Sequence, residues 1–201
     1  MINTNAGQQQ APAPSESRRD ERERRFVEDL SMRCASDLGA KARLKRSSGL
    51  TLEEAPGDAL RVFYALRPPF QREERYFLVA TLFPLAEHRA DSGNLGATLR
   101  RARTETNARG LDRRVEVLLD ADVEQLAFRL RQAVHFAHSQ RVDVDFIHLL
   151  KDILWWDAAD RRAQRGWART YFGQALERKG REAVRTDTAD APSDVDDEPE
   201  A

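Results

Sequence analysis

Apolar residues recur at helical spacing along almost the whole chain, and this periodicity constrains the fold more than any single motif. Phe26, Leu30 and Cys34 are four residues apart, as on one face of a helix. The most hydrophobic stretch, YFLVATLFPLA, is apolar on nearly all sides and contains Pro84, which predicts a central core helix that ends or bends at the proline. Convincing strand alternation between turn signals is absent. The sequence therefore predicts an all-α protein of eight or nine helices.

Turn and capping residues divide the periodic segments into separate helices. Ser36 is the expected N-cap of a helix over residues 36–46, with Leu38 and Ala42 on its inner side. A last helix carries Trp167 and ends near Gly180. The helices between them are expected to start, in chain order, at Pro56, Asn94, Asp122 and either Asp143 or Asp145.

The length of 201 residues allows one domain or two small ones. We expect a flexible arm over residues 1–17, two stacked helical subdomains over 18–108 and 109–181, and a flexible acidic tail over 182–201. The chain lacks any run near the roughly 18 apolar residues of a membrane span, and its first residues lack the apolar stretch of a signal peptide. These features predict a cytoplasmic protein without a membrane partner.

The net charge of −1 conceals an uneven distribution of charged residues. Residues 181–201 hold two arginines against eight acids, whereas residues 1–180 hold 31 basic and 26 acidic residues. The body of the protein is therefore basic and can attract polyanions. Only four of the 33 basic residues are lysine. A GC-rich genome explains this bias as well as function does, although arginine suits phosphate because its planar fork donates two parallel hydrogen bonds.

The sequence contains no clear enzymatic site. The glycines are scattered, and NLGATL has neither the spacing nor the lysine of a phosphate-binding loop. His135 and His138 share a helix face but lack an HExxH context, and the paired carboxylates precede periodic apolar runs, where acids act as caps. Cys34, the single cysteine, lies on an apolar face and is expected to be buried and inert. We therefore predict no catalytic residue, metal, cofactor or small-molecule substrate.

Basic residues gather in three stretches. Residues 95–114 contain six arginines against two acids, including the doublets Arg100, Arg101 and Arg113, Arg114, which a bend near residues 104–111 would bring to one edge. The other two stretches are KARLKR at 41–46 and RRAQR at 161–165. Each alone is typical of a solvated helix face, and together they favour a polyanion groove only if the fold brings them to one side.

The order of several segments is more specific than any one of them. NLGATLRRAR, LDRRVEVLLDAD, LAFRLRQAVHFA, VDVDFIHLLKDILWWD and RGWARTYF follow one another in the chain. This order resembles CasB, the small subunit of the type I-E CRISPR Cascade complex, over residues 35–173. The most specific parts are "LG..LRR" at Leu95–Arg101 and "D...LL.D.L.W", which begins at Asp145. The N-terminal arm and the acidic tail have no counterpart in the resemblance.

The resemblance implies a non-catalytic, all-α protein of two helical subdomains. Such a subunit is present in two copies beside the other Cascade subunits, near the guide RNA and the target DNA. Its basic face helps to hold the displaced DNA strand of the R-loop, without reading sequence, as part of antiviral defence.

The resemblance also points to nucleic-acid contacts. By motif, the first choices are Arg43, Lys45, Arg46, Arg113 and Arg114. Arg100 and Arg101 follow from the local charge and the "LRR" match. Arg131 and the basic group after the tryptophans complete the candidates: Arg161, Arg162 and Arg165. The three tryptophans suit base stacking, but their spacing favours core anchors.

Two other classes of function stay open at the level of sequence. An all-α adaptor that binds only proteins would carry the same basic stretches as solvent-facing helix surfaces. A nuclease would need a metal held by acids such as Asp143 or Asp145. Salt-dependent DNA binding without cleavage distinguishes the CasB-like function from both.

Overall fold

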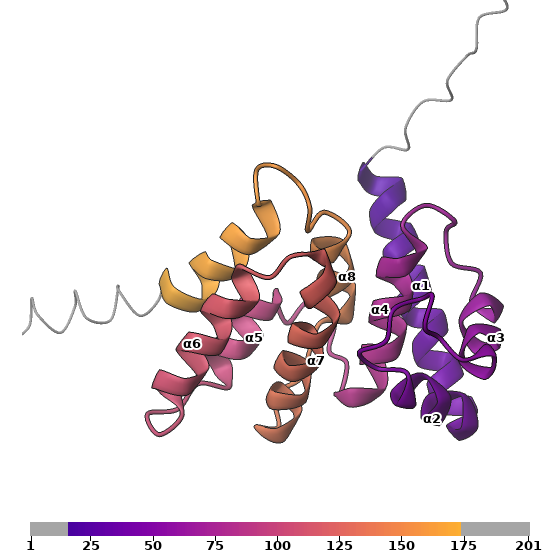
Figure 1. Ribbon diagram of the computed structural model, residues 1–201, viewed down its shortest axis with the longest axis horizontal. Helices are drawn as coiled ribbons and strands as arrows, with labels where there is room; N and C mark the ends of the chain where they lie inside the picture. Colours follow the sequence, from indigo (N-terminus) through magenta and orange to yellow (C-terminus); the bar gives the residue numbers. More distant parts are fainter. Residues whose placement is uncertain (1–15, 174–201) are drawn as a thin grey trace, which may run out of the picture. The chain divides into compact units, whose positions relative to one another are not determined.

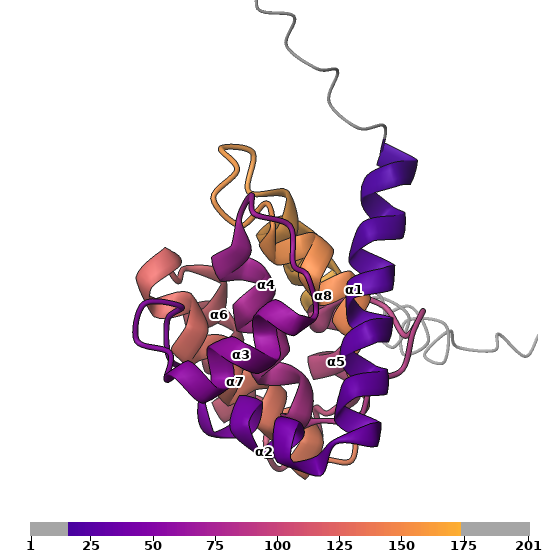
Figure 2. The same ribbon diagram turned by 90° about the vertical axis from the view of Figure 1, so that its right-hand side faces the viewer.

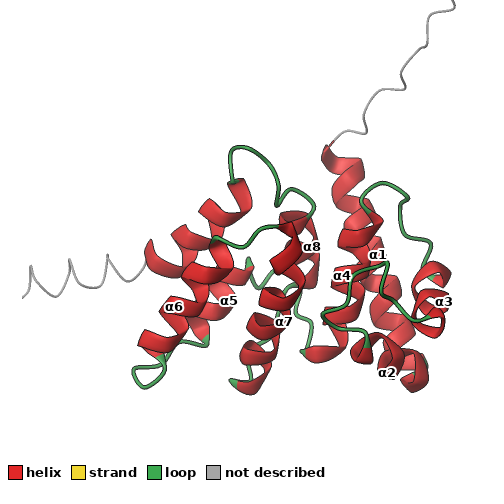
Figure 3. Cartoon of the chain, viewed as in Figure 1, coloured by secondary structure: helices red, strands yellow, loops and turns green. Residues whose placement is uncertain are grey.

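A computed structural model describes residues 16–173, and within this range the chain is built from helices joined by loops (Figure 3). The two outer segments expected to be flexible, the arm and the acidic tail, lie outside the described residues except for the first two residues of α1. That helix begins at Glu16, two residues inside the expected arm. The all-α prediction is confirmed, and the described residues contain one isolated backbone bridge, between His88 and Val144.

The chain divides into two compact units, of which the first ends at Leu85. Unit 1 contains α1 (Glu16–Ser36), α2 (Leu38–Arg46), α3 (Gly57–Ala65), α4 (Glu73–Leu82) and the short 3₁₀ helix η1 (Phe83–Leu85). Its longest helix is α1, whose N-terminal turns extend past α2 and α3 (Figure 2). Every residue of α4 from Tyr76 to Leu82 is buried, and the change to 3₁₀ geometry comes next to Pro84, as expected.

Aromatic rings form the centre of the unit 1 core. Phe26 of α1 meets Tyr76 of α4 edge to face at 4.9 Å, and Phe63 of α3 meets Phe77 at 5.2 Å. Cys34 is buried in this unit as expected, and burial raises the pKa of its thiol. Edge-to-face rings stabilise a core beyond their buried area, so these contacts hold α1, α3 and α4 together.

Two expectations for α2 were wrong. The cap is Asp37 rather than Ser36, because the Asp37 carboxylate accepts the Ala40 amide at 2.8 Å. The inner side is formed by Ala40 and Leu44, both fully buried, whereas Leu38 is 77% exposed. With the cap at Asp37, the helix face that packs on the core contains Ala40 and Leu44 instead of the expected Leu38 and Ala42.

Unit 2 contains α5 (Leu95–Arg101), α6 (Ala108–Leu119), α7 (Val123–Ser139), α8 (Phe146–Ile153) and a further helical segment over residues 162–173 (Figure 1). The expected caps Asn94, Asp122 and Asp145 are all present, each accepting a backbone amide three residues ahead at 2.8–3.0 Å. Of the alternatives Asp143 and Asp145, the second is therefore the cap. The end expected near Gly180 lies outside the described residues.

The boundary between the units differs from the one expected at residue 108. It falls after Leu85, and α5 packs against α7 of unit 2. Gly96 of α5 lies against the backbone of Trp167, so closely that a Cβ at this position would be 2.7 Å from the Trp167 Cα. The Thr170 hydroxyl also donates to the Asn94 side chain at 2.7 Å. These long-range contacts assign α5 to unit 2.

Two tryptophans anchor the core of unit 2, as their spacing predicted. Trp156 and Trp167 are 3% and 1% exposed, and their rings lie 5.0 Å apart. Trp156 Nε1 donates to the Ala121 carbonyl at 2.9 Å, and Trp167 Nε1 donates to Asp152 at 2.5 Å. With their N–H groups satisfied by the protein, these two indoles serve packing and not base stacking.

Candidate nucleic-acid interface

The candidates of unit 1 lie on α2, and two of them have an acidic partner. The guanidinium groups of Arg43 and Arg46 lie 3.7 and 3.5 Å from the Asp58 carboxylate at the start of α3. Lys45 is exposed. Asp58 partly neutralises this basic group, so it is a weaker polyanion site than the sequence suggests.

On α5, the Arg101 side chain is held by the loop before the helix. Its guanidinium donates to the Ser92 carbonyl at 2.7 Å and to the Thr98 hydroxyl at 3.2 Å. It lines a hollow of about 420 Å³ whose other charged residues are Arg89, Arg141, Asp91 and Asp143. Arg100 is half-buried, and its charge helps to lower the pKa of Asp112. The surroundings of this doublet are therefore mixed in charge.

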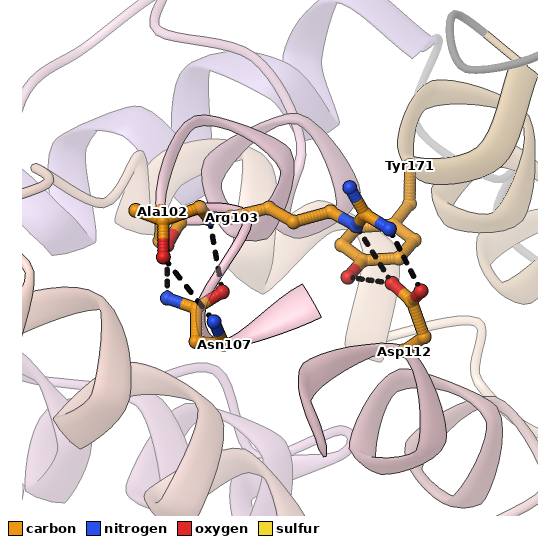
Figure 4. A network of polar contacts seen from close by, with 6 residues as sticks. Ala102, Arg103, Asn107, Asp112 and Tyr171 are labelled. Atoms are coloured by element: carbon orange, nitrogen blue, oxygen red, sulfur yellow. Dashed lines mark hydrogen bonds and ion pairs between the residues drawn. The ribbon is translucent and has the colours of Figure 1, made fainter. Parts of the chain in front are cut away.

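Arg103, between α5 and α6, forms the most complete polar contact of the arginine-rich stretch. Its Nε and Nη2 atoms donate to the two carboxylate oxygens of Asp112 at 2.8 and 2.9 Å (Figure 4). The Tyr171 hydroxyl donates to the same carboxylate at 2.6 Å. The Arg103 hydrogen bonds are the main reason that the pKa of Asp112 lies below its ordinary value of 3.8. Arg103 thus stabilises unit 2 and is not available to a ligand.

A second set of contacts shapes the turn between the two helices. The Asn107 side chain donates to the Ala102 carbonyl at 3.1 Å and accepts the Thr104 amide at 2.9 Å (Figure 4). An amide side chain that bonds local backbone in this way fixes a turn. The turn and the Arg103–Asp112 pair together fix where α6 begins, and so where the doublet Arg113, Arg114 lies.

The structure brings three candidates together between α6 and α7, which pack against each other. Arg113 and Arg114 of α6 line a hollow of about 280 Å³, and Arg114 and Arg131 line an adjoining hollow of about 490 Å³. The two hollows share Arg114, Gln132 and Phe136. We call this pair of hollows the α6–α7 groove. Among the described residues that line it there is no aspartate or glutamate.

Aromatic rings and guanidinium groups are paired along α7. The Arg114 guanidinium lies over the Phe136 ring at 5.7 Å, and the Arg129 guanidinium lies over the Phe128 ring at 5.4 Å. A guanidinium over an aromatic face keeps its N–H edge available to acceptors. The Arg114–Phe136 pair therefore gives the groove positive charge beside a flat apolar surface, as in proteins that bind single-stranded nucleic acid.

The candidates after the tryptophans differ from one another. Arg161 donates to the Leu119 carbonyl at 2.7 Å and lies 3.3 Å from Asp120, so it holds the C-terminal end of α6. Arg162 pairs with Asp160 at 3.2 Å and lies over the Trp155 ring at 5.3 Å. Arg165 is exposed. Arg161 thus has a structural role, whereas Arg165 is open to solvent.

Sequence reasoning missed two residues of the groove, Arg129 and Phe136. Both line its smaller hollow. A signal was present, because positions 129, 132, 133 and 136 follow the spacing of one helix face. The charge and aromatic character of this face can be read from the sequence of α7 alone. Its contact with α6 cannot, because that contact depends on how the two helices pack.

Several carboxylates that a nuclease could use have structural partners. Asp145 caps α8, Asp122 caps α7, and Asp120 pairs with Arg161. Within residues 16–173, no group of three or more histidine, cysteine, aspartate or glutamate residues is placed to hold a metal ion. The same residues contain no helix with the length and apolar character needed to cross a membrane.

Fold and surface together define an all-α protein of two helical units that carries an arginine-lined groove. The family model of CRISPR-associated protein Cse2 matches residues 40–172. The chain belongs to the Cse2 family.

Individual relatives agree with this assignment. A curated Cse2 protein of Thermus thermophilus is 38% identical over 105 residues, which are 51% of this chain and 59% of that protein. The match therefore spans less than two thirds of the relative's length. The crystal structure of CasB from Thermus thermophilus has a TM-score of 0.64 at 30% identity, covering 75% of this chain and 97% of that one.

A third similarity concerns the fold alone. A chain in a structure described as a CRISPR RNA-guided surveillance complex has a TM-score of 0.68 at 24% identity, covering 82% of this chain and 98% of that chain. The expected resemblance to CasB is thereby confirmed at the level of family and fold.

Proposed function

We propose that this protein is the non-catalytic small subunit of a type I-E Cascade complex in the cytoplasm. It binds single-stranded nucleic acid through the α6–α7 groove and so stabilises the displaced DNA strand of the R-loop. Its partners are the other Cascade subunits, a second copy of itself, the guide RNA and the target DNA. Membership of the Cse2 family and the named relatives support this assignment.

The observation that carries the nucleic-acid role is the convergence of Arg113, Arg114 and Arg131 on one groove without an acidic lining residue. Such a surface attracts phosphates and releases their counterions, which makes binding salt-dependent and independent of sequence. Exchange of a DNA duplex for an RNA–DNA hybrid is nearly balanced in free energy. Modest contacts to the released strand are therefore enough to favour the open state.

The exposed apolar side chains of unit 1 support a protein-binding role beside the nucleic-acid role. Phe70 is 88% exposed, and Leu38 and Met32 are 77% and 62% exposed. Phe and Met side chains are enriched in protein interfaces relative to the rest of a protein surface. In this proposal unit 1 contributes to binding other subunits. Phe70→Ser is then expected to reduce incorporation into the complex and to leave binding of single-stranded DNA by the isolated chain unchanged.

The test is a salt titration of labelled oligo-dT binding, with magnesium present and the DNA checked for cleavage. We expect log affinity to fall linearly with log salt for the wild type. In the double variant Arg113→Ala, Arg114→Ala, the steepness of this line should fall by about 1.4, or about 0.7 for each lost phosphate contact on a single strand.

The matched control is Arg109→Ala, Arg169→Ala. It removes the same charge from exposed positions of unit 2 that do not line the groove. Equal losses in the control and in the groove variant would show that only net charge matters. Absence of binding at low salt, or cleaved DNA, would overturn the proposal.

A further inference from the structure

The smaller hollow of the α6–α7 groove differs from an ordinary phosphate-binding surface because its walls are mostly apolar. Leu111 and Val115 of α6, Leu99 of α5 and Phe136 of α7 line it, with arginines among them. Its volume of about 280 Å³ is near the lower end of ligand pockets, which span roughly 300–1,000 Å³. Phosphates need no apolar cavity, so this hollow suits a compact, flat and partly apolar group.

A third arginine lines the same hollow. Arg129 of α7 is half-buried there, and its guanidinium lies over the Phe128 ring at 5.4 Å. Arginine N–H groups pair well with the carbonyl oxygens and ring nitrogens on the edge of a nucleobase. The arginines of the lining therefore offer donors that suit the edge of a base.

The Arg114–Phe136 pair offers a surface for stacking. The guanidinium lies 5.7 Å from the centre of the ring, and both side chains line the smaller hollow and the adjoining one. Bases of single strands stack on aromatic rings and on guanidinium planes. Arg131 and Arg114 line the adjoining hollow, where the phosphates on either side of an inserted base would lie.

We propose that the smaller hollow is a socket for one nucleobase of the strand that the groove binds. The inference rests on the proposed function, which supplies the strand. The arginines of the lining donate to the edge of the base, and the Arg114–Phe136 pair stacks against its face. The charge of the lining, three arginines and no acid among the described lining residues, favours a base attached to phosphates over a peptide side chain.

The experiment compares oligo-dT with a fully abasic oligomer of the same length and phosphate number at fixed salt. The charge is equal, so the ratio of the two dissociation constants reports the bases alone. We expect the wild type to bind oligo-dT about tenfold more tightly, the scale of stacking one base on an aromatic side chain. Phe136→Leu should bring this ratio close to one, because it weakens binding of oligo-dT more than binding of the abasic oligomer.

Two further variants sharpen the test. Ala133→Leu adds volume at the wall of the hollow without removing any binding group, and it should lower the ratio as Phe136→Leu does. Phe128→Leu is the matched control, because Phe128 is a half-exposed aromatic residue of α7 that does not line the hollow. It should keep the wild-type ratio. Thermal melting checks that each variant is folded.

The outcomes separate the socket from the function on which it rests. Salt-dependent and equal binding of both oligomers by the wild type would overturn the socket and support the proposed function. The socket would also be overturned if Phe128→Leu lost the preference for oligo-dT over the abasic oligomer while Ala133→Leu kept it. Failure of both oligomers to bind at low salt would overturn the proposed function together with the socket.

Discussion

Arg103 and Asp112 form a two-pronged ion pair that joins the loop after α5 to α6, with N–O distances of 2.8 and 2.9 Å. Tyr171 completes the contact from the last helical segment. The pair removes one arginine from the basic surface and fixes the helix that carries Arg113 and Arg114. Arg103 belongs to the arginine-rich stretch of the sequence, but its charge is used to position the neighbouring arginines.

Asp112→Asn is expected to destabilise the protein by about 1–2 kcal/mol, because charge-assisted hydrogen bonds are lost at a partly exposed site. The folded pKa of Asp112 lies below 3.8. The ionised Asp112 carboxylate therefore contributes its full stabilisation at pH values above its ordinary pKa. This stabilisation is lost as the pH falls through the lower pKa of the folded state. Urea unfolding at several pH values should show a constant difference between wild type and variant at neutral pH and a shrinking one below about pH 4.

Asp120→Asn is the control for this measurement, since Asp120 forms an exposed pair with Arg161. Its effect should stay within about 0.5 kcal/mol. Equal effects of the two substitutions would contradict the structural role of the Arg103–Asp112 pair.

Gly96→Ala is expected to cost at least about 1–3 kcal/mol, because an added Cβ would overlap the Trp167 backbone and the Thr170 hydroxyl. Backbone cannot move aside as a flexible side chain can. Gly110→Ala is the matched control, as nothing lies within 4 Å of its Cβ position. In α6 this change should be neutral or stabilising by up to about 1 kcal/mol. Similar stabilities of the two variants in denaturant would disprove the close approach at Gly96.

Glu23 introduces a pH dependence in unit 1. Its carboxylate is buried and accepts the Tyr76 hydroxyl at 3.1 Å, while its Oε2 atom has no partner in the described structure. Burial raises the pKa of Glu23 above its ordinary 4.5. The folded state then binds more protons than the unfolded state just above that value, so stability falls as pH rises through this range.

Glu23→Gln should abolish this slope and increase stability at neutral pH by about 1 kcal/mol, since no buried charge remains. Glu28→Gln, at an exposed position of the same helix, serves as control. Thermal melting of the three proteins between pH 4.5 and 8 checks the expectation. Parallel profiles for wild type and Glu23→Gln would show that Glu23 does not titrate in that range.

The sequence motifs that identified the family carry structure more than binding. Gly96 of "LG..LRR" allows α5 to approach Trp167, and Asp145 of "D...LL.D.L.W" caps α8. Asp152 of the same motif accepts the Trp167 indole N–H. Such residues are recognisable because a cap or a close approach allows few side chains. The helical spacing of apolar residues predicted the fold class, and capping residues predicted most helix starts, because both depend on local chemistry.

Properties that depend on distant contacts were harder to predict. Ser36 and Asp37 are both good caps, and only the register of α2 against the core decides between them. The boundary after Leu85 depends on the packing of α5 with residues far along the chain. Motif and charge indicated Arg113, Arg114 and Arg131, but their convergence with Phe136 requires α6 and α7 to pack. Arg161 is the opposite case. The sequence indicated a nucleic-acid contact, but in the structure its guanidinium donates to the Leu119 carbonyl.

The central claim, that the α6–α7 groove holds a single strand, is tested most directly by photo-crosslinking. Oligo-dT containing 5-iodouracil is bound to the full chain at low salt, irradiated and digested, and the crosslinked peptides are identified by mass spectrometry. The account predicts crosslinks concentrated in residues 111–118 and 129–139, and their loss in Arg113→Ala, Arg114→Ala but not in Arg109→Ala, Arg169→Ala. Crosslinks concentrated on α2 or spread evenly over the exposed arginines would contradict it.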